Sequence, residues 1–197
     1  MPPNWAGLHH ATGRRRMGNN DNFQGVPMAF SIYDATVAPL THMLGSYSGF
    51  LTKAENYAKE KGIDPKSYLT AKLYEDMFDL TRQVQIASDN AKGGAARLAQ
   101  VESPKYEDNE ASFDDLRARL KNTIAFMRSI DPKAFEGAED RKIVLKFPQR
   151  EFNFNSGADY LNNWVLPNVY FHITTGYGIL RMKGVPVGKP DFLSGGK

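Results

Sequence analysis

Four segments of this chain repeat apolar residues at steps of three and four positions, the spacing that forms one face of an α-helix. These segments cover residues 31–61, 76–100, 112–130 and 156–183. Helices that each carry one apolar face bury those faces most simply against one another. The sequence therefore predicts an all-α domain built as a four-helix bundle.

The sequence also marks where these helices begin and end. Gly62 follows the first segment, where a residue in the left-handed conformation commonly ends a helix. Ser112, with Asp115 three positions later, is typical of a serine that caps a helix together with an acidic partner. Gly184 and Pro186 end the last segment. We expect the tail after them to be extended.

Residues 141–154 change from a helical period to the alternation of a β-strand. Apolar residues alternate with polar or charged ones on both sides of Pro148-Gln149, a pair typical of a tight turn. We therefore predict a small β-hairpin inserted before the last long helix. The alternating residues are Ile143, Leu145 and Phe147 before the turn, and Phe152 and Phe154 after it.

Residues 1–27 differ from the rest of the chain. They are rich in proline, glycine and asparagine, and they cannot bury enough apolar surface to offset the entropy of ordering. We expect residues 1–27 to form a flexible leader and residues 28–197 to form one domain. Met28 opens the first periodic segment and could itself be a natural start.

Composition excludes several classes of protein. The chain has 41% hydrophobic and 24% charged residues, as an ordinary globular protein does. It has no cysteine, so disulfides and thiolate nucleophiles are excluded, which fits a reducing compartment. A net charge of +3 is too small to indicate a nucleic-acid partner, and no apolar run is long enough to span a membrane. We expect a cytoplasmic protein.

Four blocks of the sequence read "SIYDATVAPLTHMLG", "LYEDMFDLTRQVQIASDNAKGGAARL", "FEGAEDRKIVL" and "LPNVYFHITTGYGILR". Together they resemble an uncharacterised domain-of-unknown-function family in the DinB-like superfamily. The resemblance implies a four-helix bundle that is commonly a homodimer. It also implies that a divalent metal could be held by three histidines, one on the second helix and a pair four residues apart on the fourth. Some such proteins are thiol transferases or related small-molecule enzymes.

The last helix offers Asn168 and His172 where the superfamily pattern has its two histidines. Residues four apart lie on one face of a helix, and at about 100° per residue His172 falls on the apolar, inward side. The second helix has no histidine, and by the same count Gln83 lies at the edge of its apolar stripe, whereas Gln85 points away from it. His42 lies off the apolar stripe of the first helix and is expected to be exposed.

These residues support two interpretations of the site. Neutral amide oxygens are weak ligands for zinc or nickel, so His172, Asn168 and Gln83 make a poor metal site, and we expect no cofactor. His172 would then be a buried imidazole bonded to Asn168, Gln83 or a tyrosine, in a homodimer that is structural or binds a small molecule. The alternative is a DinB-like enzyme, of thiol or small-molecule transferase type, with His172 as general base or as a zinc or nickel ligand.

Overall fold

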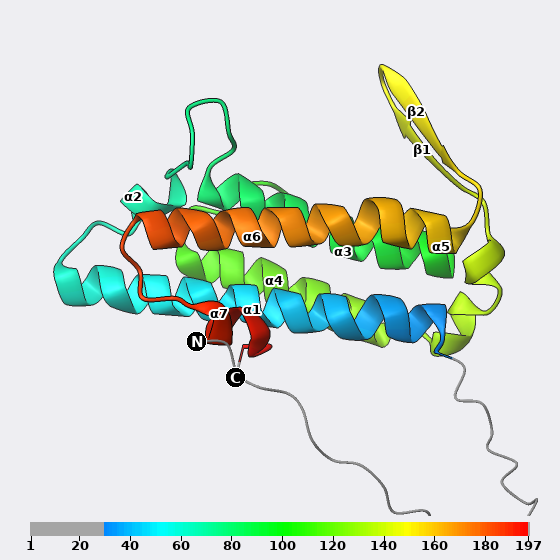
Figure 1. Ribbon diagram of the computed structural model, residues 1–197, viewed down its shortest axis with the longest axis horizontal. Coiled ribbons are helices and arrows are strands. Elements are labelled where there is room, and N and C mark those ends of the chain that lie inside the picture. The colour runs from blue at the N-terminus through cyan, green and yellow to red at the C-terminus, as the bar shows by residue number, and fades with distance from the viewer. Residues whose placement is uncertain (1–29, 197) are drawn as a thin grey trace, which may run out of the picture.

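The structure, a computed structural model, describes residues 30–196. Its long helices are α1 (Ile32–Lys61), α3 (Leu80–Ala99), α4 (Phe113–Ser129) and α6 (Leu166–Met182). They lie side by side, with α3 packed against α4 and α6, and α1 packed against the same two helices (Figure 1). The predicted fold, mostly helical with one small antiparallel sheet, is confirmed.

Capping groups hold the ends of α1 and α4 where the sequence placed them. The Ser112 hydroxyl accepts a hydrogen bond of 3.1 Å from the backbone N–H of Asp115 and donates one of 2.7 Å to its carboxylate. Ser31 caps α1 in the same way with Asp34. Gly62 ends α1 with φ of 64°, in the left-handed region that glycine adopts without strain.

The second long helix begins later than predicted. The pattern placed its start at position 76, whereas α3 begins at Leu80. The reason is the Asp79 carboxylate, which accepts a hydrogen bond of 2.9 Å from the backbone N–H of Arg82 and so caps the helix. Met77 continues the apolar period into a segment that is not helical, because apolar spacing alone does not mark a helix end.

Small residues on α3 allow it to approach the last helical segment closely. Gly94 is buried, and a Cβ atom there would lie 2.6 Å from the Val165 side chain. Tyr160, which lies earlier in the same segment, accepts a long hydrogen bond of 3.4 Å from Arg97. As the chain advances along α3, its contacts therefore move back toward earlier residues of the last helical segment, so the two run antiparallel.

The hairpin consists of β1 (Ile143–Phe147) and β2 (Arg150–Phe154), paired antiparallel with Ile143 opposite Phe154. It projects beyond the helices at one end of the molecule (Figure 1). Its aromatic side chains pack on Trp164, whose ring centroid lies 4.6 Å from that of Phe152. The predicted hairpin is thus confirmed.

The last helical segment is interrupted near its start. Helix α5 (Gly157–Tyr160) leads into a wide π-helical turn, η3 (Leu161–Val165), and α6 follows. Pro167 lies in the first turn of α6 and has no backbone N–H to donate to the preceding turn. The uninterrupted helix predicted for residues 156–183 is therefore present in three parts.

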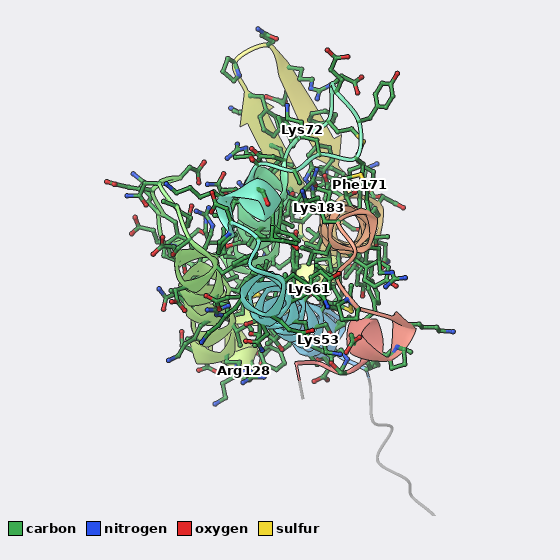
Figure 2. The ribbon with its side chains drawn as sticks, turned by 90° about the vertical axis from the view of Figure 1, so that its left-hand side faces the viewer. Lys53, Lys61, Lys72, Arg128, Phe171 and Lys183 are labelled. Atoms are coloured by element: carbon green, nitrogen blue, oxygen red, sulfur yellow. The ribbon has the colours of Figure 1, made fainter. Side chains whose placement is uncertain are left out.

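The predicted extended tail is wrong, because residues Lys189–Leu193 form a short helix, α7, that packs on α1. The exposed His42 ring donates a hydrogen bond of 3.0 Å from Nε2 to the backbone carbonyl of Leu193. Lys53, labelled beside α7 in Figure 2, forms an ion pair of 2.6 Å with Asp191. Phe192 of α7 also stacks on Phe50, with ring centroids 6.0 Å apart, so this segment docks through both polar and apolar contacts.

Three further short elements connect the long helices: α2 (Lys66–Leu69), η1 (Pro132–Phe135) and η2 (Ala138–Asp140). The leader predicted for residues 1–27 lies outside the described residues. Among residues 30–196, no helix combines the length and apolar character needed to cross a bilayer.

Candidate functional site

The structure brings together two of the three predicted site residues. Gln83 of α3 and His172 of α6 meet between these helices, where the Nδ1 atom of His172 lies 2.7 Å from the side-chain oxygen of Gln83. His172 is only 9% exposed, so the prediction that it faces inward is confirmed. Gln83, placed at the edge of its stripe by the sequence, is buried as well.

A second bond of Gln83 fixes the tautomer of His172. The amide nitrogen of Gln83 donates a hydrogen bond of 3.1 Å to the backbone carbonyl of Phe78, so its oxygen faces the imidazole. An oxygen can only accept, and therefore the Nδ1 atom of His172 carries the proton. The Nε2 atom keeps its lone pair and has no hydrogen-bond partner within residues 30–196.

The surroundings of His172 also keep its imidazole neutral. Burial lowers its pKa from 6.5 to about 4, and the nearby positive charge of Arg82 adds to this effect. At neutral pH, the ring is therefore uncharged. It can accept a hydrogen bond at Nε2, but it is a weaker base than an ordinary histidine.

Asn168 does not join the pair. Its amide nitrogen donates a hydrogen bond of 2.6 Å to the backbone carbonyl of Trp164, one turn earlier. Asn168 is half-buried and lines a neighbouring groove instead of contacting His172. Asn168 and His172 share one face of the helix, as the sequence predicted, but their side chains contact different groups: His172 bonds Gln83, whereas Asn168 bonds Trp164 and lines the groove.

The groove has a volume of about 650 Å³ and lies between the hairpin, the outer side of α3 and the start of α6. Phe78, whose backbone carbonyl accepts the hydrogen bond from Gln83, also lines the groove, so the groove lies beside the Gln83–His172 pair, although His172 itself is not a lining residue. Aromatic and arginine side chains dominate its lining. The lining residues are Phe78, Arg82, Ile86, Asp89, Asn90, Arg97, Leu145, Phe147, Arg150, Trp164 and Asn168.

Residues 32–193 match the family described as "Domain of unknown function (DUF1993)". The chain belongs to this family. The crystal structure of a DinB family member from Shewanella denitrificans is 38% identical in sequence, with a TM-score of 0.74. The alignment covers 82% of this chain and 90% of that one. Comparison with curated proteins found no match.

The resemblance to the DinB-like superfamily raises the question whether these residues fit a divalent metal. Within residues 30–196, no group of three or more histidine, cysteine, aspartate or glutamate side chains is placed to share an ion. The free Nε2 atom of His172 points in a different direction from Nδ1, which Gln83 occupies. The amide of Asn168 is turned to Trp164. These donors do not converge on one point and do not fit a tightly held zinc or nickel ion.

Gln85 is buried, which its expected position off the apolar stripe did not predict. Its amide nitrogen donates a hydrogen bond of 2.8 Å to Glu110, and its oxygen accepts one of 3.0 Å from Arg82. The loop between α3 and α4 covers this side of α3 and supplies the partner. Gln85 therefore belongs to a polar network that lies beside the site.

The centre of that network is Arg119, which the sequence analysis missed. Its side chain is 2% exposed and forms ion pairs of 2.8 Å with Asp89, 3.0 Å with Asp108 and 2.7 Å with Glu110. Because Arg119 follows Leu116 by three positions, it falls on the inward face of α4. A charged residue on the apolar face of a predicted helix was therefore the signal in the sequence that could have predicted a buried ion pair at Arg119.

Proposed function

We propose that this chain is a DinB-like four-helix bundle that binds a small molecule beside His172, without a tightly held divalent metal. One observation carries the proposal. Gln83 holds a neutral imidazole in one tautomer, with a free acceptor at Nε2, next to a groove of about 650 Å³. Concave sites with aromatic walls and a few placed polar groups are typical of small-molecule binding.

The contacts among the long helices support the bundle. α1 and α3 each pack against both α4 and α6, and α1 also contacts α3. Such mutual burial is what four amphipathic helices achieve around one core.

We also propose that the protein is a cytoplasmic homodimer. Phe171, labelled on α6 in Figure 2, is 58% exposed, and Phe78 at the start of α3 is 56% exposed. Exposed aromatic side chains of this kind are enriched at protein interfaces. Sedimentation equilibrium of the wild type and of Phe171→Ser tests the dimer, and a monomeric wild type at micromolar concentration would contradict it.

Metal analysis of protein purified without a histidine tag tests the first proposal. We expect zinc and nickel contents far below one per chain, in the wild type and in His172→Ala alike. A stoichiometric metal that is lost in His172→Ala would contradict it. Neither His9 nor His10 should matter, and a chain that begins at Met28 provides the matched control.

A second candidate function rests on the Nε2 lone pair of His172. A fixed tautomer with a free acceptor is also the arrangement of a general base or a sole imidazole ligand in an enzyme of thiol or small-molecule transferase type. The pH dependence of any turnover separates the candidates. Catalysis by His172 as base should fall as the pH drops toward its pKa of about 4 and should be abolished in His172→Gln.

A further inference from the structure

The arginines of the groove indicate which class of small molecule it takes, an inference that rests on the proposed binding function. The groove lining contains Arg82, Arg97 and Arg150 but only one carboxylate, that of Asp89. Asp89 is already paired at 2.8 Å with both Lys92 and Arg119. The groove therefore carries positive charge that its own acidic residue does not neutralise.

Two of these arginines lack a carboxylate partner. Arg82 forms an ion pair of 2.5 Å with Asp108, whereas Arg97 and Arg150 form no ion pair within residues 30–196. Both are exposed and can meet a solute. A guanidinium presents a planar fork of donors that matches a carboxylate.

Neighbouring residues hold both guanidinium groups in place. A Cβ atom at position 93 would lie 2.7 Å from Nη1 of Arg97, so the absence of a side chain at Gly93 lets the guanidinium fold back along α3. The same Nη1 atom donates to the hydroxyl of Tyr160. The guanidinium of Arg150 lies 4.7 Å from the centroid of the Phe152 ring. Because these contacts already restrict the two guanidinium groups, less side-chain conformational entropy is lost when a ligand binds them.

The rest of the groove is suited to a flat ring. Trp164 and Phe147 line it, their ring centroids lie 6.4 Å apart, and Phe147 is 49% exposed. A planar ligand placed against these side chains would bury apolar surface that now faces water. The oxygen of Asn168 remains able to accept a bond from a donor on such a ligand, because its amide nitrogen is the atom bonded to Trp164.

From these contacts we infer that the groove binds a small aromatic carboxylate, with the carboxylate held by Arg97 and Arg150 and the ring against Trp164 and Phe147. The positive charge selects an anion, and the aromatic walls select a planar one. The polar end of the ligand lies at the hairpin, and its ring extends along α3 toward Asn168 and His172.

Titration of the full chain with three matched probes tests the inference. The probes are 2-naphthoate, its neutral amide 2-naphthamide and the cation 2-naphthylmethylammonium. NMR follows the indole N–H of Trp164 and the Nε–H groups of Arg97 and Arg150, and calorimetry gives the affinity. We expect saturable shifts at all three residues with 2-naphthoate, and binding of the amide weaker by about tenfold or more.

Arg97→Gln and Arg150→Gln should each weaken 2-naphthoate binding by about tenfold, and added salt should weaken binding to the wild type. Arg128→Gln is the matched control, because Arg128 is an exposed arginine in the last turn of α4, outside the groove (Figure 2). It should leave binding unchanged. Equal loss in the control would show a nonspecific charge effect and overturn the inference.

The remaining outcomes separate the ligand class from the binding function. If the amide or the ammonium probe shifts Trp164 as tightly as 2-naphthoate, the anion inference is wrong, but small-molecule binding in the groove stands. If none of the probes shifts any groove residue, both the inference and the proposed binding function fail.

Discussion

Gln83 and His172 are 89 positions apart in the chain, yet their side chains form a hydrogen bond of 2.7 Å in the interior between α3 and α6. The bond joins a neutral acceptor to a neutral donor, because burial lowers the pKa of the imidazole to about 4. The charge state of this pair is therefore open to change by a single substitution.

Gln83→Glu should raise the pKa of His172 from about 4 to about 6 or above, because a carboxylate beside Nδ1 stabilises the protonated ring. NMR titration of the His172 ring protons measures this, with His172→Gln used to assign the signals. Asn90→Asp adds the same charge to α3 without contacting His172 and should leave the pKa near its wild-type value. An unchanged pKa in Gln83→Glu would contradict the observed contact.

Acid should destabilise the wild type through His172. In the folded protein, burial lowers the pKa of the His172 imidazole to about 4, whereas in the unfolded chain the imidazole has its ordinary pKa of 6.5. Between these values the unfolded state binds more protons, so the His172 contribution to stability is complete above pH 6.5 and is lost as the pH falls toward 4. The loss should reach about 1–3 kcal/mol.

Urea unfolding from pH 4 to pH 7 measures this loss, with His172→Gln as the reference. The substituted side chain cannot titrate in this range, so the difference between the two pH profiles isolates the histidine. Parallel profiles would show that His172 is protonated equally in both states.

Arg119→Met should lower the free energy of unfolding by about 2–4 kcal/mol, because it leaves Glu110, whose side chain is only 7% exposed, without its cation. Lys121→Met is the matched control, since Lys121 is exposed on the same helix. It should change stability by less than about 0.5 kcal/mol. Denaturant midpoints at constant slope provide the measurement.

Tyr47→Phe should cost little or no stability, although Tyr47 is fully buried in the core. Its hydroxyl has no hydrogen-bond partner within residues 30–196, so removing it also removes the cost of desolvating that group. Thermal unfolding should give a melting temperature equal to or above that of the wild type. A loss of more than about 1 kcal/mol would indicate a partner for the hydroxyl.

Gly176→Ala should lower the free energy of unfolding by about 2 kcal/mol or more, since the new Cβ atom would lie 1.9 Å from the Tyr47 hydroxyl oxygen. Adding Tyr47→Phe should restore part of this stability, because it removes the hydroxyl that the new Cβ atom meets. The rescue should be incomplete, because atoms of the ring still lie close to the Cβ atom. Gly178→Ala is the control, with its nearest neighbour a flexible Leu73 side chain at 3.3 Å. Additive effects of the two substitutions would show that the residues are not coupled.

The sequence was a good guide to helix faces and a poor guide to what covers them. Apolar spacing placed His172 inward and Gln83 at the seam, because the helical period fixes which residues share a side. It did not predict the burial of Gln85, because the partner that buries this residue comes from the loop between α3 and α4. Burial of a polar side chain depends on such a distant partner and has no local period.

The groove illustrates the same limit. Its lining combines Arg97 of α3, Arg150 of the hairpin and Trp164 of η3, which are brought together only by the docking of the hairpin. The hairpin itself was predictable from its alternation and turn. The side of the molecule on which it would lie was not, because no pattern within residues 143–154 specifies the angle at which it leaves the helices.

The wide turn η3 sets the rotational phase of every residue that follows it. In a π-helical turn the backbone bonds span five residues, one more than in an α-helix, and one residue corresponds to about 100° of rotation. If Leu161–Val165 kept all of its residues but closed into a regular α-helix, α6 would be turned by about that angle relative to α5. His172 would lose Gln83 and move toward solvent even though its own neighbours in the sequence were unchanged.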